Sequence, residues 1–315
     1  MNEFELIQRY FTRHAANAVL GVGDDAAIVR PTPHHDLHIS TDMLVQGQHF
    51  FSDVSPYALG HKTLAVNLSD MAAMGATPCW AVLSLALPQL DKTWISEFSE
   101  GFFKLAEEHG LSVIGGDTTC GPLTLSVTIF GETPPGQALR RDAAQAGDDI
   151  WVSGSLGLAA LAIQQRLHSN PSIPDSVIAE CTQKLEYPTP RVALGKNLLG
   201  LAHSAIDISD GLMADLGHIL ARSNVGADIW FENIPTHPWL ANNRRAFAEI
   251  ITAGGDDYEL CFTAPYSARE KIAKLAEDLC CSLTRVGRIE HKKNIRLTDK
   301  FEQPITLSNS GYTHF

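Results

Sequence analysis

The chain has 315 residues, of which 44% are hydrophobic, and its formal net charge at pH 7 is −12. At about 100–200 residues per domain, this length predicts two domains with ordinary apolar cores. The negative charge argues against broad binding to nucleic acid or to an anionic membrane surface. No apolar run is long enough to span a bilayer, so no membrane attachment is expected.

The cysteines and the amino-terminal residues indicate the compartment. Six cysteines are present and none belongs to a C-x-x-C pair, so free thiols are expected. The chain begins without the basic and apolar regions of a signal peptide. Free thiols fit a reducing environment, and we therefore expect a cytoplasmic protein.

In chain order, the first half alternates between helix and strand patterns. Its predicted elements are a helix over 2–14, a strand over 37–44, a helix over 56–74, a strand over 79–87, a helix around 94–105, and strands over 112–114 and 123–130. Pro, Gly and Ala are frequent over 132–148, which is typical of a linker. We therefore expect one domain over 1–147 and another over 148–315.

The second half repeats the alternation. Its predicted elements are a strand over 150–152, a helix after Gly157, a helix over 190–202, an apolar run ending at Asp207, a helix from Leu212, a strand over 258–262, a helix over 268–279 and terminal strands. Alternating elements in both halves predict two α/β or α+β domains.

Five short motifs join Asp to Gly, Ser or Thr beside an apolar segment. They are Gly21-Val22-Gly23-Asp24-Asp25, Ser40-Thr41-Asp42, Asn67-Leu68-Ser69-Asp70, Gly115-Gly116-Asp117-Thr118-Thr119 and Asp207-Ile208-Ser209-Asp210-Gly211. Hard cations such as Mg²⁺ take oxygen ligands, usually one or two carboxylates together with waters and substrate phosphates. Aspartates from several scattered segments would suit a site for more than one Mg²⁺.

Taken singly, each motif has a plainer interpretation. Asp24-Asp25 is equally consistent with a polar hairpin turn, and Asp70 with a solvated aspartate, although its uncharged neighbours are not typical of a charged outer face. The exposed pair Arg140-Arg141 would usually face solvent, but arginine also suits phosphate. The sequence contains no P-loop, Rossmann glycine motif, H-E-x-x-H or G-x-S-x-G. Nucleotide phosphates, if bound, would depend on carboxylate-held Mg²⁺.

Together the motifs resemble those of the thiamine-monophosphate kinase family. The resemblance also rests on His49-Phe50, on Gly254-Gly255-Asp256-Asp257-Tyr258-Glu259-Leu260 and on the terminal Gly311-Tyr312-Thr313-His314-Phe315. It implies the two-domain fold of aminoimidazole ribonucleotide synthetase, with a C-terminal α/β sandwich and an N-terminal sheet that pairs across a homodimer. It also implies that the γ-phosphoryl group of ATP is transferred to thiamine monophosphate with the help of several Mg²⁺ ions.

The resemblance assigns residue roles motif by motif. The implied Mg²⁺ ligands are Asp24, Asp25, Thr41, Asp42, Asp70, Asp117, Asp207 and Asp210; the implied ATP contacts are Gly116, Asp117, Arg141 and Ser209; and the implied thiamine-monophosphate contacts are His49, Asp256 and Tyr312. The expected catalytic set is Asp25, Asp42, Asp70, Asp117 and Asp207. Relatives usually carry Glu where this chain has Asp256, which keeps the charge on a shorter side chain.

The chemistry agrees with this assignment. A phosphate acceptor is already ionised near neutral pH, so catalysis consists mainly of positioning and charge neutralisation. No Ser, Cys or His in the motifs is set up as a nucleophile, which favours direct transfer without a phosphoenzyme. The alternatives are another ATP-dependent synthetase of the same superfamily and a non-catalytic nucleotide-binding maturation factor. Selenophosphate synthetases usually carry a reactive residue near the N-terminus, whereas the first cysteine here is Cys79.

Overall fold

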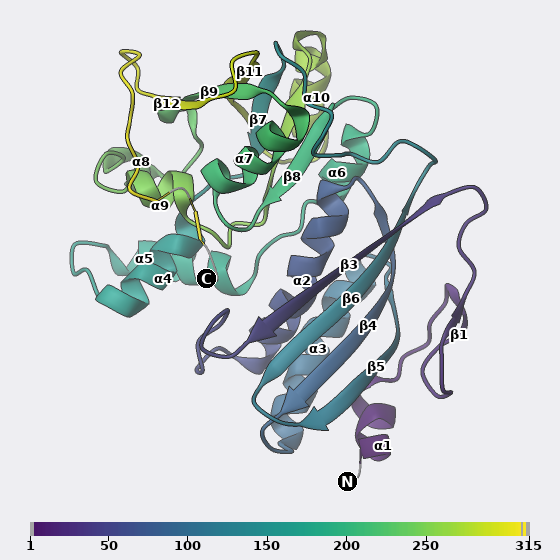
Figure 1. Ribbon diagram of the computed structural model, residues 1–315. Coiled ribbons are helices and arrows are strands. Elements are labelled where there is room, and N and C mark those ends of the chain that lie inside the picture. Colours follow the sequence, from purple (N-terminus) through teal and green to yellow (C-terminus); the bar gives the residue numbers. More distant parts are fainter. Residues whose placement is uncertain (1–2, 310, 313–315) are drawn as a thin grey trace. The chain divides into compact units, whose positions relative to one another are not determined.

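The computed structural model describes residues 3–309, 311 and 312 and divides into two compact units (Figure 1). Unit 1 comprises the residues up to Met71 together with Ala76–Gly136, and unit 2 comprises Ala72–Gly75 together with the residues from Gln137. Each unit contains both helices and a mixed sheet, which confirms the predicted α/β (α+β) class. Among the described helices, none is long and apolar enough to cross a membrane.

Unit 1 is built on a four-stranded sheet with helices against one face (Figure 1). The strand order is β3 (Asp36–Val45), β6 (Thr124–Thr133), β4 (Thr77–Leu87) and β5 (Ser112–Cys120), and only β4 and β5 are parallel. The helices are α2 (Pro56–Ala73) and α3 (Lys92–Glu108). Before the sheet come α1 (Glu3–Leu6), the π-helical turn η1 (Ile7–Phe11), and the small pair β1 (Ala18–Leu20) and β2 (Ile28–Val29).

Side chains of β3 alternate between the two faces of this sheet. Ser40 and Asp42 stand opposite Ile129 and Val127 of β6, which are fully buried beneath the helices. Leu37, Ile39, Thr41 and Met43 alternate with them on the other face, where Leu37, Ile39 and Met43 are exposed by 43%, 61% and 56%. One face of β3 therefore carries polar groups toward the helices, and the other presents an apolar row.

Unit 2 contains a six-stranded sheet, in which only β12 and β9 are parallel. The strand order is β12 (Ile295–Thr298), β9 (Gly226–Trp230), β11 (Leu283–Glu290), β7 (Asp149–Ser153), β10 (Glu259–Ala264) and β8 (Ser204–Ile208). Its helices are α4 (Leu158–His168), α5 (Asp175–Glu186), α6 (Val192–Leu198), α7 (Leu212–Ser223), α8 (Pro238–Asn242), α9 (Ala248–Ala253) and α10 (Arg269–Asp278), with short turns η2 (Phe231–Asn233) and η3 (Tyr266–Ala268).

Three sequence predictions differ from the structure. The expected helix over 2–14 is a short α-helix followed by a π-turn that ends at Phe11, and position 2 lies outside the described residues. The expected helix over 190–202 ends at Leu198, because Leu199 is extended and Gly200 has a φ of 71°. The strand expected over 112–114 does not end there but continues through Gly115–Thr119 as β5. Gly116 serves a close approach to Leu83 on β4 rather than a change of direction.

Candidate active site

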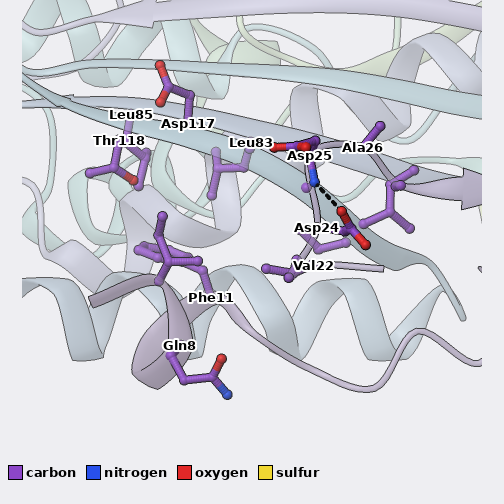
Figure 2. A pocket seen from close by; sticks show the side chains of 17 residues that line it. Gln8, Phe11, Val22, Asp24, Asp25, Ala26, Leu83, Leu85, Asp117 and Thr118 are labelled. Carbon is purple, nitrogen blue, oxygen red and sulfur yellow. Dashed lines mark hydrogen bonds between the residues drawn. The ribbon is translucent and has the colours of Figure 1, made fainter. Parts of the chain in front are cut away.

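Three of the predicted acidic residues line one cavity of about 570 Å³ in unit 1 (Figure 2). Asp24 and Asp25 come from the loop before β2, and Asp117 comes from the edge strand β5. All three side chains are exposed, and the carboxylate of Asp24 accepts the backbone N–H of Asp25 at 2.9 Å. The rest of the lining includes apolar side chains such as Phe11, which suits a ligand with both a flat apolar part and charged groups.

Gly116 brings backbone rather than a side chain to this cavity. A Cβ at position 116 would overlap the carbonyl oxygen of Leu83 on β4, so no other residue fits without moving a strand. The adjacent N–H and C=O groups of β5 therefore lie at the cavity wall beside Asp117. The glycine itself is explained by the close approach of β4.

Asp42 and Asp70 face the same layer between β3 and α2. The hydroxyl of Ser40 donates to the carboxylate of Asp70, and the buried amide of Asn67 accepts the N–H of Asp42 at 3.3 Å. Asn67 and Asp70 are three residues apart and share one helix face. Asp70 is half-buried, so it does not belong to a freely solvated outer surface.

Thr41 and His49 lie near these acids but are oriented differently. The Thr41 hydroxyl is 2.8 Å from that of Thr128, on the face of β3 opposite to Asp42. The Nδ1 of His49 accepts the N–H of Val45 at 3.0 Å. This hydrogen bond assigns the proton of the neutral ring to Nε2, which is then a donor.

In unit 2, the turn between β8 and α7 carries three predicted site residues, and two more are bonded to it. Asp207 is the buried penultimate residue of β8, and Ser209 and Asp210 form the turn that follows. The carbonyl oxygen of Ser209 accepts the N–H of Asp256 at 2.8 Å, and that of Asp210 accepts the N–H of Tyr312 at 3.0 Å. The structure thus joins predicted cation and nucleotide residues directly to predicted acceptor residues.

Arg141 does not join this group. It is exposed, and its carbonyl oxygen accepts the hydroxyl of Ser223, the last residue of α7. Helix α7 has 12 residues, so at ~1.5 Å per residue its two ends are about 18 Å apart. The backbone of Arg141 therefore lies at the end of α7 away from Asp210.

The donors fit Mg²⁺ in kind. Among the described residues, no three His, Cys, Asp or Glu side chains lie close enough to hold a metal ion on their own. Mg²⁺ rarely needs this, because one or two carboxylates, waters and substrate phosphates complete its octahedron. The pairs Asp24 with Asp25, and Asp42 with Asp70, offer only hard oxygen ligands.

Two buried carboxyl groups were missed by the sequence analysis. Asp215, in the first turn of α7, accepts the backbone N–H groups of residues 209–211, while burial raises its pKa to about 7 against the lowering effect of these bonds. Burial raises the pKa of Asp257 to about 8, and its Oδ2 accepts the N–H of Gly157 at 2.9 Å. Asp215 had a signal: it stands three residues after Leu212, on the predicted apolar face.

Comparison with known proteins defines the class first. The family model described as "AIR synthase related protein, N-terminal domain" matches residues 23–133, and the corresponding C-terminal domain model matches 145–300. Together they cover most of the chain, so the two-domain fold expected from the resemblance is confirmed.

Individual relatives narrow the class. The thiamine-monophosphate kinase of Escherichia coli (strain K12) is 41% identical over 99% of this chain and 98% of its own length. The crystal structure of thiamine-monophosphate kinase from Stenotrophomonas maltophilia K279a is 46% identical, covers 94% of this chain and 96% of its own, and superposes with a TM-score of 0.87. A structure of AaThiL complexed with AMPPCP and TMP is 29% identical, with a TM-score of 0.78, covering 99% and 96%. The chain belongs to the thiamine-monophosphate kinase family.

Proposed function

We propose that the protein phosphorylates thiamine monophosphate to thiamine diphosphate, with ATP as the phosphoryl donor. The observation that carries this function is the match to thiamine-monophosphate kinases across essentially the whole chain, in both domains. AaThiL, which shares the fold, forms a complex with AMPPCP and TMP. A full-length match to kinases of this name counts against the two alternative functions, a different ATP-dependent synthetase and a non-catalytic maturation factor.

Unit 1 supplies the proposed nucleotide pocket. Its cavity has an apolar lining for the base, the backbone of β5 at Gly116 for close approach, and the carboxylates of Asp25 and Asp117 at its edge. Ser209 of unit 2 is proposed as a further ATP contact. On the basis of the resemblance, Arg141 is also proposed to contact ATP, through its long side chain.

Several Mg²⁺ ions are proposed as cofactors, held by Asp24, Asp25, Thr41, Asp42, Asp70, Asp117, Asp207 and Asp210. When bound, such ions neutralise the charge of ATP and of the acceptor phosphate. The chain's own part is to hold the ligands in place: the Ser40 hydroxyl binds the carboxylate of Asp70, and the Asn67 amide oxygen binds the backbone N–H of Asp42. Fixed ligands require little rearrangement as negative charge shifts during transfer.

The acceptor is proposed to bind through Asp256, Tyr312 and His49. Asp256 offers a carboxylate to a cationic or amine-bearing heterocycle, and the half-exposed ring of Tyr312 offers an aromatic face. The Nε2 proton of His49 suits a phosphate oxygen. Because a phosphate acceptor needs no general base, we propose direct in-line transfer with no covalent enzyme intermediate.

We also propose a cytoplasmic homodimer, with functional domains over 1–147 and 148–315. The exposed row of Leu37, Ile39 and Met43 on β3 supports sheet-to-sheet pairing, because an apolar row of this kind is unusual on a monomer's surface. The interface would leave the helix-covered face of the sheet, with Asp42 and Asp70, unaffected.

An ADP-release assay against a panel of acceptors tests the function. We expect turnover with thiamine monophosphate, and none with thiamine or with aminoimidazole precursors. Product analysis should give thiamine diphosphate and ADP in equal amounts. Turnover with an aminoimidazole precursor alone would identify a different synthetase, and ATP binding without any turnover would identify a maturation factor.

A further inference from the structure

A single carboxylate fixes one side of the turn between β8 and α7. Asp215 is only 3% exposed, and its Oδ2 is the common acceptor for three consecutive backbone N–H groups. The three donors are Ser209 at 3.1 Å, Asp210 at 3.0 Å and Gly211 at 3.0 Å. These three bonds favour the ionised carboxyl group and burial favours the protonated one; with a proton on Oδ1, Oδ2 still accepts. The N–H side of the turn is thus tied to one atom.

The C=O side of the same turn is tied to the acceptor segments. Each of its three carbonyl groups accepts one backbone N–H from a distant part of unit 2. The pairs are Tyr258 to Ile208 at 2.8 Å, Asp256 to Ser209 at 2.8 Å and Tyr312 to Asp210 at 3.0 Å. Two of these donors are the proposed acceptor-binding residues themselves.

The two sides cannot move independently. A peptide group is planar, so the C=O of Ser209 and the N–H of Asp210 rotate together. A rotation that weakens the bond to Asp215 therefore also turns the oxygen that holds Asp256. The same holds for the next peptide group, which links the N–H of Gly211 to the bond between Asp210 and Tyr312.

We propose that Asp215 is a positioning residue that sets the spacing between the nucleotide and cation side of the site and the acceptor side. The roles of Asp210, Asp256 and Tyr312 rest on the proposed function, whereas the mechanical link does not. Weakening the acceptor at position 215 should therefore disturb the acceptor segments, although among the described residues Asp215 bonds only to the turn and not to 256–258 or 312.

Amide hydrogen exchange in the free protein tests the link without any substrate. In Asp215→Asn, which keeps the size of the side chain, the amides of Asp256 and Tyr312 should exchange about ten-fold faster or more, equivalent to ~1.4 kcal/mol of lost protection. The matched control is Asp149→Asn, which removes a buried carboxylate that pairs with Arg269 and Arg285 elsewhere in unit 2. It should lower the melting temperature and leave both amides protected.

A second variant approaches the link from the other side. A Cβ in Gly311→Ala would lie 2.4 Å from the Cβ of Ala214 on α7 and 2.9 Å from the carbonyl oxygen of Asp210, so residue 311 must shift and the bond from Tyr312 should weaken. The coupling is reciprocal, so the amide of Gly211 should then exchange faster. Unchanged exchange of Gly211 here, or of Asp256 and Tyr312 in Asp215→Asn, overturns the proposal.

Kinetics gives the functional readout. Asp215→Asn should raise the KM for ATP and the KM for thiamine monophosphate together, whereas Asp149→Asn should change neither. A rise in only one KM contradicts the positioning role. If the wild-type protein makes no thiamine diphosphate, the proposed function fails, and the exchange experiment still decides the role of Asp215.

Discussion

The phenolic hydroxyl of Tyr258 donates a hydrogen bond to Oδ1 of Asp256, 3.0 Å away, and both residues have positive φ angles, 50° and 66°. Asp tolerates this left-handed conformation better than most side chains, whereas Tyr does so at a cost. The Tyr258 hydroxyl fixes the direction of the Asp256 carboxylate, and the backbone N–H of Asp256 is bonded to the carbonyl of Ser209. Acceptor recognition should therefore be sensitive to small changes at these two positions.

Asp256→Asn should raise the KM for thiamine monophosphate about ten-fold, the effect of ~1.4 kcal/mol, and leave the KM for ATP almost unchanged. Asn tolerates the left-handed backbone, so the substitution tests charge rather than strain. Tyr258→Phe is the matched control, because it removes only the hydroxyl and should give a smaller rise. Asp256→Glu should stay active. Steady-state kinetics measures both KM values. If Asp256→Asn raises only the KM for ATP, Asp256 does not belong to the acceptor pocket.

Asp70→Asn should lower kcat by at least ~10²-fold, because it removes charge from a proposed cation site in the reacting centre. Ser40→Ala separates charge from orientation: it removes the hydrogen bond to Asp70 but keeps the carboxylate. Ser40→Ala should lower kcat about five-fold, the effect of losing one hydrogen bond worth roughly 1 kcal/mol. Rates should be measured over a range of Mg²⁺ concentrations. Near-normal turnover of Asp70→Asn at all concentrations would show that Asp70 is no ligand.

Ile39→Asp should convert the proposed homodimer into a monomer at micromolar concentration. The substitution buries a charge in the centre of the apolar row on β3, where 61% of Ile39 is exposed in the single chain. Val19→Asp is the control, because Val19 is similarly exposed but belongs to the separate pair β1–β2. Sedimentation velocity distinguishes the outcomes. A monomeric wild type with full activity would refute the dimer.

Asp257 should make stability fall as pH rises. Its folded pKa is raised to about 8 by burial, against 3.8 in a model peptide, so between these values the folded chain holds a proton that the unfolded chain lacks. The free energy of unfolding then falls with pH, by at most ~1.4 kcal/mol per unit, and levels off above pH 8.

Urea unfolding at pH 6.0 and 8.5 measures this effect. Asp257→Asn resembles the protonated carboxyl and should lose less stability than the wild type between the two pH values. The control is Asp149→Asn. Burial opposes ionisation of Asp149, but Arg269 and Arg285 hold its pKa low, so Asp149 is ionised at both pH values. This variant should therefore lose the same stability relative to the wild type at pH 6.0 and at pH 8.5. Parallel pH dependence of the wild type and Asp257→Asn would show that Asp257 is ionised throughout.

Local sequence patterns were sufficient for much of the fold. Helix α2 begins at Pro56, as predicted, and strand β3 spans the predicted 37–44. Strand β3 alternates regularly, and α2 has clear end signals at Pro56 and Gly75 although nearly all of its residues are buried. Strand β5 was underestimated because Gly115 and Gly116 suggested a turn, whereas the close approach of β4 explains the glycine at 116.

The sequence indicates which residues belong to the candidate site, but not the hydrogen bonds that join them. Asp motifs are visible in the sequence, and the roles proposed for Asp256 and Tyr312 rest on family resemblance. The bonds that join them to residues 209 and 210 cross 47 and 102 positions of the chain, as the residue numbers show. No periodic pattern reports contacts at such separations. Asp215 is the exception, since an acid on the apolar face of a helix is a local sign of a buried partner.

Residues 209–211 turn three N–H groups toward one point, a concavity that commonly binds a phosphate oxygen. Here that place is already filled by an anion that belongs to the chain, the carboxylate of Asp215. At residues 209–211 a polyphosphate would therefore find the backbone N–H groups already taken and the acidic side chains of Asp207 and Asp210 nearby. If ATP contacts this turn through Ser209, as proposed, the backbone of residues 209–211 would favour the nucleotide as its cation complex over the free nucleotide.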